Sequence, residues 1–263
     1  MAHRTRLSAN LGFLWVQKPL LERIELAAAS GFRAIELHWP YDTPADEVHR
    51  ACQKYSLSLL SINTPQGDVA TGDAGLAAQV GREAEFKETF ELALAWALGS
   101  SAKMIHVLPG MANVDEPEIA HQTLIENLRW AADRAKPHGI TLLLEALNPR
   151  DKPGYFYHTQ QASDSVRQAV ERDNVKLMFD VYHVGVTEGD VLTKLAHFMP
   201  HIGHIQIAAV PSRCEPDEGE IRYEAVFDQI ATLGYEGWIG CEYKPRSNVE
   251  DGLLWRQAMG LKI

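Results

Sequence analysis

The sequence predicts a single (β/α)8 TIM barrel domain over residues 1–263, and three observations support this fold class. Short apolar segments alternate with amphipathic segments along the whole chain, which is typical of parallel strands joined by helices. Eight such pairs fit into 263 residues, a length at which one barrel closes. A doubly wound sheet is the second candidate, but no GxGxxG motif follows the first strand to support it.

Apolar runs bounded by turn-forming residues predict the eight strands. The runs are six to nine residues long and rich in aliphatic side chains, as buried parallel strands require. In chain order, the predicted strands are 6–13, 34–39, 57–63, 103–110, 141–147, 175–183, 202–208 and 237–243. Because successive side chains of a strand point to opposite faces, we expect Cys241 to point away from Glu242 and into packing.

Apolar residues at helical spacing predict a helix after each strand. In the first helix Leu20, Ile24 and Ala27 share one face, and Gly31 ends the helix. In chain order, the predicted helices are 19–30, 44–55, one containing 86–98, 116–135, 161–172, 190–198, 223–233 and one after 249. The segment 64–81 is longer than most connections in compact domains, a length that is typical of functional lids.

Composition excludes several classes of function. The formal net charge is -10 and the pI is near 5.5, so nucleic acid and membrane surfaces are not expected as partners. Three widely spaced cysteines without a CxxC motif indicate a reducing cytoplasm rather than a disulfide framework. No apolar run reaches the length of about 18 residues that a membrane span needs, and the N-terminus lacks the apolar core of a signal peptide. The sequence does not determine the oligomeric state, and it is compatible with a homo-oligomer.

An oxygen-bearing side chain stands at the end of each of the last four predicted strands. These residues are Glu145 in LLLEAL, Asp180 in KLMFDVYH, Gln206 in HIQIA and Glu242 in WIGCEY. The carboxyl ends of barrel strands converge on the face where barrel enzymes keep their active sites. Three carboxylates and an amide that meet there form a cage for a hard divalent cation. The alternative interpretation, four ordinary polar strand ends in solvent, is less favoured because all four successive strands share the feature.

Charge counting predicts further residues at this site. Two carboxylates about 4 Å apart repel by roughly 4 kcal/mol at an effective dielectric near 20, a cost that a cation removes. Three carboxylates and a divalent cation still leave one negative charge, so an anionic substrate needs an additional cation. Arg213, in the loop after the seventh strand, and Lys244, two residues after Glu242, are the candidates. His183, three residues after Asp180, and His106, in the fourth strand, are the candidate pocket histidines.

At these residues the chain resembles the xylose isomerase-like TIM barrels. Within them it is most similar to the hydroxypyruvate isomerase family, which also includes 2-oxo-tetronate isomerases. The resemblance extends over nearly the whole chain, and its segments are SANLGFLW, INTPQGD, GRE, HVLPG, NLRWAADRAKPHGITLLLEALNP, HIQIAAVPSRCEPDEGEI and GYEGWIGCEYKP. The last three are long and therefore specific.

The resemblance implies a cofactor and roles for the site residues. It implies a divalent metal, Mg²⁺ before Mn²⁺, on Glu145, Asp180, Gln206 and Glu242. It gives acid–base catalysis to Glu145 and Glu242, and substrate binding to His183 and Arg213. Related ketose epimerases usually carry His where Gln206 stands. The amide therefore favours the hydroxypyruvate isomerase branch, and an all-oxygen cage favours Mg²⁺.

The implied reaction is the isomerisation of a small anionic 2-oxo acid. Hydroxypyruvate becomes tartronate semialdehyde through an enediolate. The nearest alternative is 2-oxo-tetronate isomerisation, and a ketose 3-epimerase follows. A metal-dependent DNA-repair nuclease on this fold would need more histidine ligands and a basic face, which the net charge of -10 opposes. A barrel that has lost its chemistry and serves as a scaffold is the non-enzyme alternative.

Overall fold

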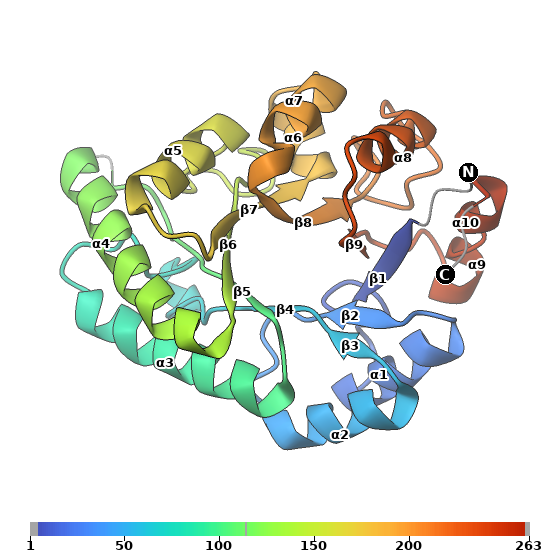
Figure 1. The fold of residues 1–263 in the computed structure, drawn as a ribbon, viewed down its shortest axis with the longest axis horizontal. Helices are drawn as coiled ribbons and strands as arrows, with labels where there is room; N and C mark the ends of the chain where they lie inside the picture. The colour runs from blue at the N-terminus through green and yellow to red at the C-terminus, as the bar shows by residue number, and fades with distance from the viewer. Residues whose placement is uncertain (1–4, 114, 261–263) are drawn as a thin grey trace.

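Parallel strands form the centre of the computed structural model, which describes residues 5–113 and 115–260, and helices surround them (Figure 1). The strands are β1 (Arg6–Asn10), β2 (Ala34–Glu36), β3 (Ser58–Leu59), β4 (Ser61–Asn63), β5 (Met104–His106), β6 (Thr141–Glu145), β7 (Val175–Asp180), β8 (Ile202–Ile207) and β9 (Trp238–Cys241). Among the described residues, neighbouring strands of the sheet pair in parallel, and β1 pairs with both β2 and β9. The predicted barrel class is confirmed.

The third predicted strand is divided at Leu60, which is why eight predicted strands correspond to nine observed ones. Its first half, β3, pairs with β2, and its second half, β4, pairs with β5. Between them, the Leu60 amide donates to the Ile35 carbonyl at 2.9 Å, and the Leu60 carbonyl accepts from Met104 at 2.9 Å. Backbone hydrogen bonds therefore continue across the division, and the ring of strands closes there.

The helices follow the predicted order. They are α1 (Leu20–Ala29), α2 (Ala45–Tyr55), α3 (Glu83–Ser100), α4 (Pro117–Ala135), α5 (Gln160–Val170), α6 (Val181–Thr187), α7 (Val191–Phe198), α8 (Tyr223–Thr232), α9 (Val249–Gly252) and α10 (Trp255–Ala258). Short 3-10 turns are η1 (Val69–Thr71), η2 (Lys136–His138) and η3 (Met199–His201). Pro117 occupies the first turn of α4, where its missing N–H costs nothing. None of the described helices combines the length and the apolarity needed to cross a membrane.

Helix α6 was not predicted, because the sequence 175–183 reads as one continuous strand. The strand instead ends at Asp180, whose side-chain oxygen accepts from the Tyr182 amide at 2.8 Å. This contact is a helix N-cap, and it starts α6 directly at the end of β7. His183 therefore lies on the first turn of a helix rather than on a strand. Cys241 is buried in the core, as the alternation along the last strand predicts.

The loops at the carboxyl end of the barrel are joined to one another. The segment 64–81, whose length is typical of functional lids, forms a bridge between Gly75 and Pro109 in the loop after β5. That loop in turn bridges to the loop after β6 through Met111 and Tyr155. The Ala112 amide donates to the Gly154 carbonyl at 2.8 Å. Backbone hydrogen bonds thus fix the loops that surround the barrel mouth relative to one another.

Candidate active site

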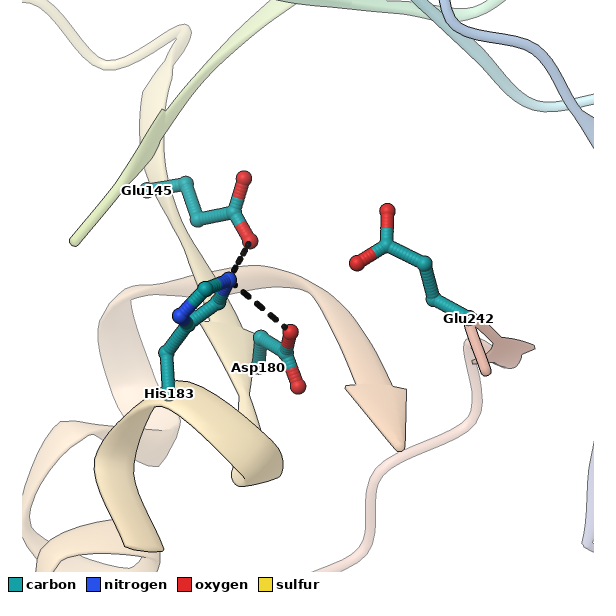
Figure 2. A group of neighbouring side chains, drawn as sticks. All are labelled: Glu145, Asp180, His183 and Glu242. Carbon is teal, nitrogen blue, oxygen red and sulfur yellow. Dashed lines mark ion pairs between the residues drawn. The ribbon is translucent and has the colours of Figure 1, made fainter. Parts of the chain in front are cut away.

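Four buried side chains meet at the carboxyl end of the barrel (Figure 2). Glu145 ends β6, Asp180 ends β7, and Glu242 follows β9 directly. His183 joins them from the first turn of α6, with its Nε2 atom 3.5 Å from Asp180 Oδ2 and 3.8 Å from Glu145 Oε1. One ligand atom of each residue lies within 4.8 Å of those of the others. Three of the four predicted ligands are therefore close neighbours.

The fourth predicted ligand, Gln206, lies on β8 directly opposite Asp180 in the β7–β8 register. Its Nε2 atom donates to Glu36 Oε2 at 2.7 Å and to Glu242 Oε1 at 3.2 Å. Its Oε1 atom is buried and has no hydrogen-bond partner among the described residues. Because the amide nitrogen is engaged, the oxygen is the atom left for a ligand.

Unpaired oxygens show that these residues fit a divalent metal. Within the described parts of the chain, Glu145 Oε1, Asp180 Oδ2 and Gln206 Oε1 are buried without a hydrogen-bond partner. Buried polar atoms in folded proteins are almost always paired, and an unpaired one carries its full desolvation cost. A group of carboxylate and amide oxygens is the donor set of a hard cation. An ion bound here satisfies all three atoms together.

Burial and mutual repulsion disfavour the ionised carboxylates of this group. Burial, followed by the charge of Glu242, raises the pKa of Asp180 to about 8. Burial, followed by the charges of Glu242 and Asp180, raises the pKa of Glu145 well above its usual range. A bound cation reverses both effects, because it favours the ionised forms.

This pKa shift predicts that stabilisation by a metal increases with pH. The folded-state pKa of Asp180, about 8, is above its value in the unfolded chain. Metal-free protein therefore loses stability as the pH rises through about 8, whereas metal binding becomes easier because no proton has to leave. We expect Mg²⁺ to raise the melting temperature more at about pH 9 than at about pH 6. Differential scanning calorimetry of chelated protein with and without Mg²⁺ measures the difference; an equal shift at both pH values contradicts the coupling.

Glu242 lies in the opposite electrostatic environment. Its Oε1 atom accepts from Asn10 Nδ2 at 2.9 Å and lies 3.0 Å from His38 Nε2. Its Oε2 atom accepts from Arg213 Nη2 at 2.7 Å. Although burial acts to raise the pKa of Glu242, the hydrogen bond with His38 and the charge of Arg213 bring it below its usual range. The pKa values of Glu145 and Glu242 are thus pushed in opposite directions.

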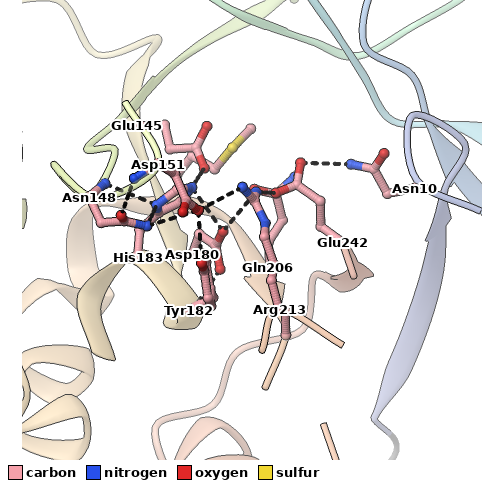
Figure 3. Close-up of polar contacts among 12 residues, drawn as sticks. Asn10, Glu145, Asn148, Asp151, Asp180, Tyr182, His183, Gln206, Arg213 and Glu242 are labelled. Atoms are coloured by element: carbon pink, nitrogen blue, oxygen red, sulfur yellow. Dashed lines mark hydrogen bonds and ion pairs between the residues drawn. The ribbon is translucent and has the colours of Figure 1, made fainter. Parts of the chain in front are cut away.

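The imidazole ring of His183 is hydrogen-bonded to Asn148, as Figure 3 shows. Its Nδ1 atom accepts from the backbone amide of Asn148 at 3.0 Å, so it is unprotonated. Burial, followed by the charge of Arg213, lowers the pKa of His183 to about 3, so the ring is neutral at ordinary pH. A neutral imidazole with a free Nδ1 lone pair has its hydrogen on Nε2. His183 is therefore a hydrogen-bond donor toward the site and not a metal ligand in this tautomer.

Two other predicted residues also border the site. His106 is buried, with Nδ1 3.5 Å from Glu145 Oε2, and burial lowers its pKa to about 4, so it is neutral. The Arg213 guanidinium lies 4.8 Å from the centre of the Phe13 ring and 4.9 Å from that of Tyr182. These contacts fix its plane against two aromatic rings.

Lys244 does not reach the site. Its side chain is exposed, and it does not line the cavity beside the carboxylates. The expectation assumed that strand alternation continues past Glu242. The last strand, β9, ends at Cys241, so the alternation does not extend to Lys244.

Several site residues were missed by the sequence interpretation. Asn10 and Glu36 end β1 and β2, so the same strand-end criterion that selected the other residues also applies to them. His38 follows β2 and contacts Glu242 from 204 positions away. Asp151 accepts from the Tyr182 hydroxyl at 2.8 Å and pairs with Arg213 at 3.4 Å. These distant contacts depend on barrel closure and have no local sequence signal.

Glu36 is a buried carboxylate next to Gln206, and it contacts several polar side chains. Besides Gln206, it accepts from the Ser8 hydroxyl at 2.8 Å and lies 3.1 Å from His204 Nε2. A Cβ atom at position 240 would collide with the Glu36 carboxylate, so the glycine there makes room for it. The carboxylate engages the amide nitrogen of Gln206 and in this way fixes which atom of that amide is free.

A cavity of about 290 Å³ opens beside the carboxylates. Glu145, Glu242, His106, His183 and Arg213 line it. So does a lysine from the loop after β6, Lys152. The volume suits a small molecule, and the lining is mostly polar or charged near the carboxylates.

Comparisons with known proteins agree with this fold. A family model described as xylose isomerase-like TIM barrel matches residues 24–261. A 2-oxo-tetronate isomerase from Cupriavidus necator is 43% identical over 251 residues, which are 95% of this chain and 96% of the relative. Hydroxypyruvate isomerase from Escherichia coli is 38% identical, covering 95% and 97% of the two chains. A crystal structure described as AP endonuclease, family 2, from Brucella melitensis has 40% identity and a TM-score of 0.94, covering 97% and 98%. The chain therefore belongs to the xylose isomerase-like TIM barrel family.

Proposed function

We propose that this protein is a metal-dependent isomerase that interconverts hydroxypyruvate and tartronate semialdehyde. The observation that carries the proposal is the set of buried, unpaired oxygens of Glu145, Asp180 and Gln206 beside Glu242. The relatives named hydroxypyruvate isomerase and 2-oxo-tetronate isomerase, similar over most of their length, support the reaction class.

Mg²⁺ is the proposed cofactor, with Mn²⁺ as the second candidate. Glu145, Asp180, Gln206 and Glu242 would hold it, and each offers an oxygen atom, the ligand that hard cations prefer. When bound, the ion polarises the substrate carbonyl and stabilises negative charge that develops on its oxygen.

The protein groups would move the protons. One of Glu145 and Glu242 would remove a proton from the hydroxymethyl carbon of hydroxypyruvate, and the other would deliver a proton to the former carbonyl carbon of the enediolate. The hydroxyl proton moves to the former carbonyl oxygen, so that the hydroxymethyl carbon becomes the aldehyde of tartronate semialdehyde. In the metal-free protein the two carboxyl groups already differ, because the pKa of Glu145 is raised and the pKa of Glu242 is lowered. The Nε2–H of His183 donates to a substrate oxygen, and Arg213 adds positive charge at the same place.

The second candidate substrate is 2-oxo-tetronate, which is one carbon longer. It is favoured by the 43% identity to the Cupriavidus necator enzyme of that name. A substrate panel with Mg²⁺ tests the proposal and ranks the two acids by kcat/KM. We expect turnover of at least one of these acids and slower reaction of uncharged ketoses. No turnover of any short 2-oxo acid by metal-loaded enzyme would refute the function.

DNA cleavage is the other activity that a similar structure suggests, through the crystal structure described as an AP endonuclease. The net charge of -10 disfavours binding to a polyanion. Among the described residues, one candidate metal group is found, and it contains a single histidine. Duplex DNA with an abasic site belongs in the panel as a negative control, and cleavage of it would favour the nuclease.

A further inference from the structure

An anionic substrate needs a cation at this site beyond the metal. The carboxylates of Glu145, Asp180 and Glu242 exceed the charge of a divalent ion by one, and Asp151 adds a fourth carboxylate nearby. One arginine, Arg213, offsets only one of the two remaining negative charges. A carboxylate that enters the cavity is therefore repelled unless another cationic side chain receives it.

Arg213 is already engaged by the protein. Its guanidinium pairs with Glu242 at 2.7 Å, with Asp151 at 3.4 Å and with Asp180 at 3.8 Å. Two aromatic rings hold its faces. A substrate carboxylate that took this arginine would have to displace one of these partners, so Arg213 suits the reacting oxygens near the metal ligands better than the far end of the substrate.

Lys152 is the other lysine or arginine that lines the cavity. Its side chain is half-buried and, within residues 5–113 and 115–260, it takes part in no ion pair. Its backbone position is fixed, because its amide donates to the Asn148 carbonyl at 3.0 Å and its carbonyl accepts from Tyr155 at 3.3 Å. The same Asn148 holds the His183 ring at 3.0 Å. One turn thus positions a free ammonium group and a substrate-facing imidazole together.

We infer that Lys152 binds the carboxylate of the 2-oxo acid and so selects acids over neutral ketoses. This inference rests on the proposed function. A lysine ammonium receives a carboxylate as a point charge in a charge-assisted hydrogen bond. With the acid end at Lys152, the carbonyl and hydroxyl ends of a three- or four-carbon substrate point toward the carboxylates in a cavity of about 290 Å³.

The test compares Lys152→Met, Lys152→Arg and Lys244→Met with the wild type. The steady-state constants are measured for hydroxypyruvate and 2-oxo-tetronate. The inhibition constant is measured for dihydroxyacetone, the uncharged counterpart of hydroxypyruvate. Lys54→Met, an exposed position on α2, is the matched control. Circular dichroism and melting temperature establish that each variant is folded.

We expect Lys152→Met to raise KM for the acids by about 10- to 100-fold, the effect of losing one charge-assisted contact. The kcat and the inhibition constant for dihydroxyacetone should change little, and Lys152→Arg should restore most of the affinity. An unchanged KM in Lys152→Met, an equal loss for dihydroxyacetone, or a loss in Lys244→Met instead would overturn the inference while leaving the isomerase function intact. Absence of wild-type turnover would instead remove the function and this inference with it.

Discussion

Glu145→Gln is expected to lower kcat by about 10³-fold while the protein stays folded. The amide has the same shape as the carboxylate, but it does not accept a proton from carbon, and its neutral oxygen binds a cation more weakly than a carboxylate does. The fold should persist, because burial disfavours the charge at this position and the neutral amide escapes that cost. Steady-state assays of hydroxypyruvate turnover measure the loss of kcat. A thermal melt of the metal-free protein measures whether the variant is folded.

Glu242→Gln should produce a similar loss of turnover with a larger structural effect. The substitution removes the charge that pairs with Arg213 at 2.7 Å, so a mostly buried guanidinium loses its nearest partner. Glu22→Gln, a partly exposed position on α1, is the matched control for both variants. Near-normal kcat in either active-site variant would exclude that residue from proton transfer.

Chelation is expected to lower turnover by a similar factor, about 10³-fold, and Mg²⁺ should restore it. Without the ion, Glu145 Oε1, Asp180 Oδ2 and Gln206 Oε1 lack a partner, and repulsion favours protonation of the carboxylates. The same ion should stabilise the fold, by about 2.7 kcal/mol at a free concentration one hundred times its Kd.

The measurement has two readouts that do not depend on each other. Activity is followed after EDTA treatment and after titration with Mg²⁺ or Mn²⁺, and calorimetry follows metal binding to the unloaded protein. As a control for other effects of the chelator, protein is treated with EDTA that has first been saturated with Mg²⁺. Full activity in protein shown by elemental analysis to contain no metal would contradict a metal-dependent mechanism.

The barrel could be predicted from the sequence because each unit of it is signalled locally. Apolar runs of strand length alternate with helical periodicity, and glycine or proline separates them, as Gly31 does after α1. Glu145, Asp180 and Gln206 could be selected because strand ends of a parallel barrel share one face. That criterion needs only the order of elements and the position of each residue within its strand.

The remaining parts of the site depend on where strands end and on contacts across the barrel. Asp180 caps a helix at a point where the apolar run of the sequence continues, and β9 ends at Cys241, too early for strand alternation to orient Lys244. The pairing of His38 with Glu242 joins residues 204 positions apart. No local pattern marks Lys152 as different from any other loop lysine. Lys152 differs from the others because its loop, after β6, is joined to the loop after β5 and borders the cavity.

Gly240 has no chemistry of its own, yet it constrains how the sequence can vary. A side chain at that position would push the Glu36 carboxylate away, and Glu36 holds the nitrogen of the Gln206 amide. Without Glu36, that amide nitrogen keeps only its hydrogen bond to Glu242, and the orientation of the amide is less fixed. A substitution at position 240 is therefore expected to weaken the proposed cation site through Glu36, a residue of another strand, while the barrel fold is kept.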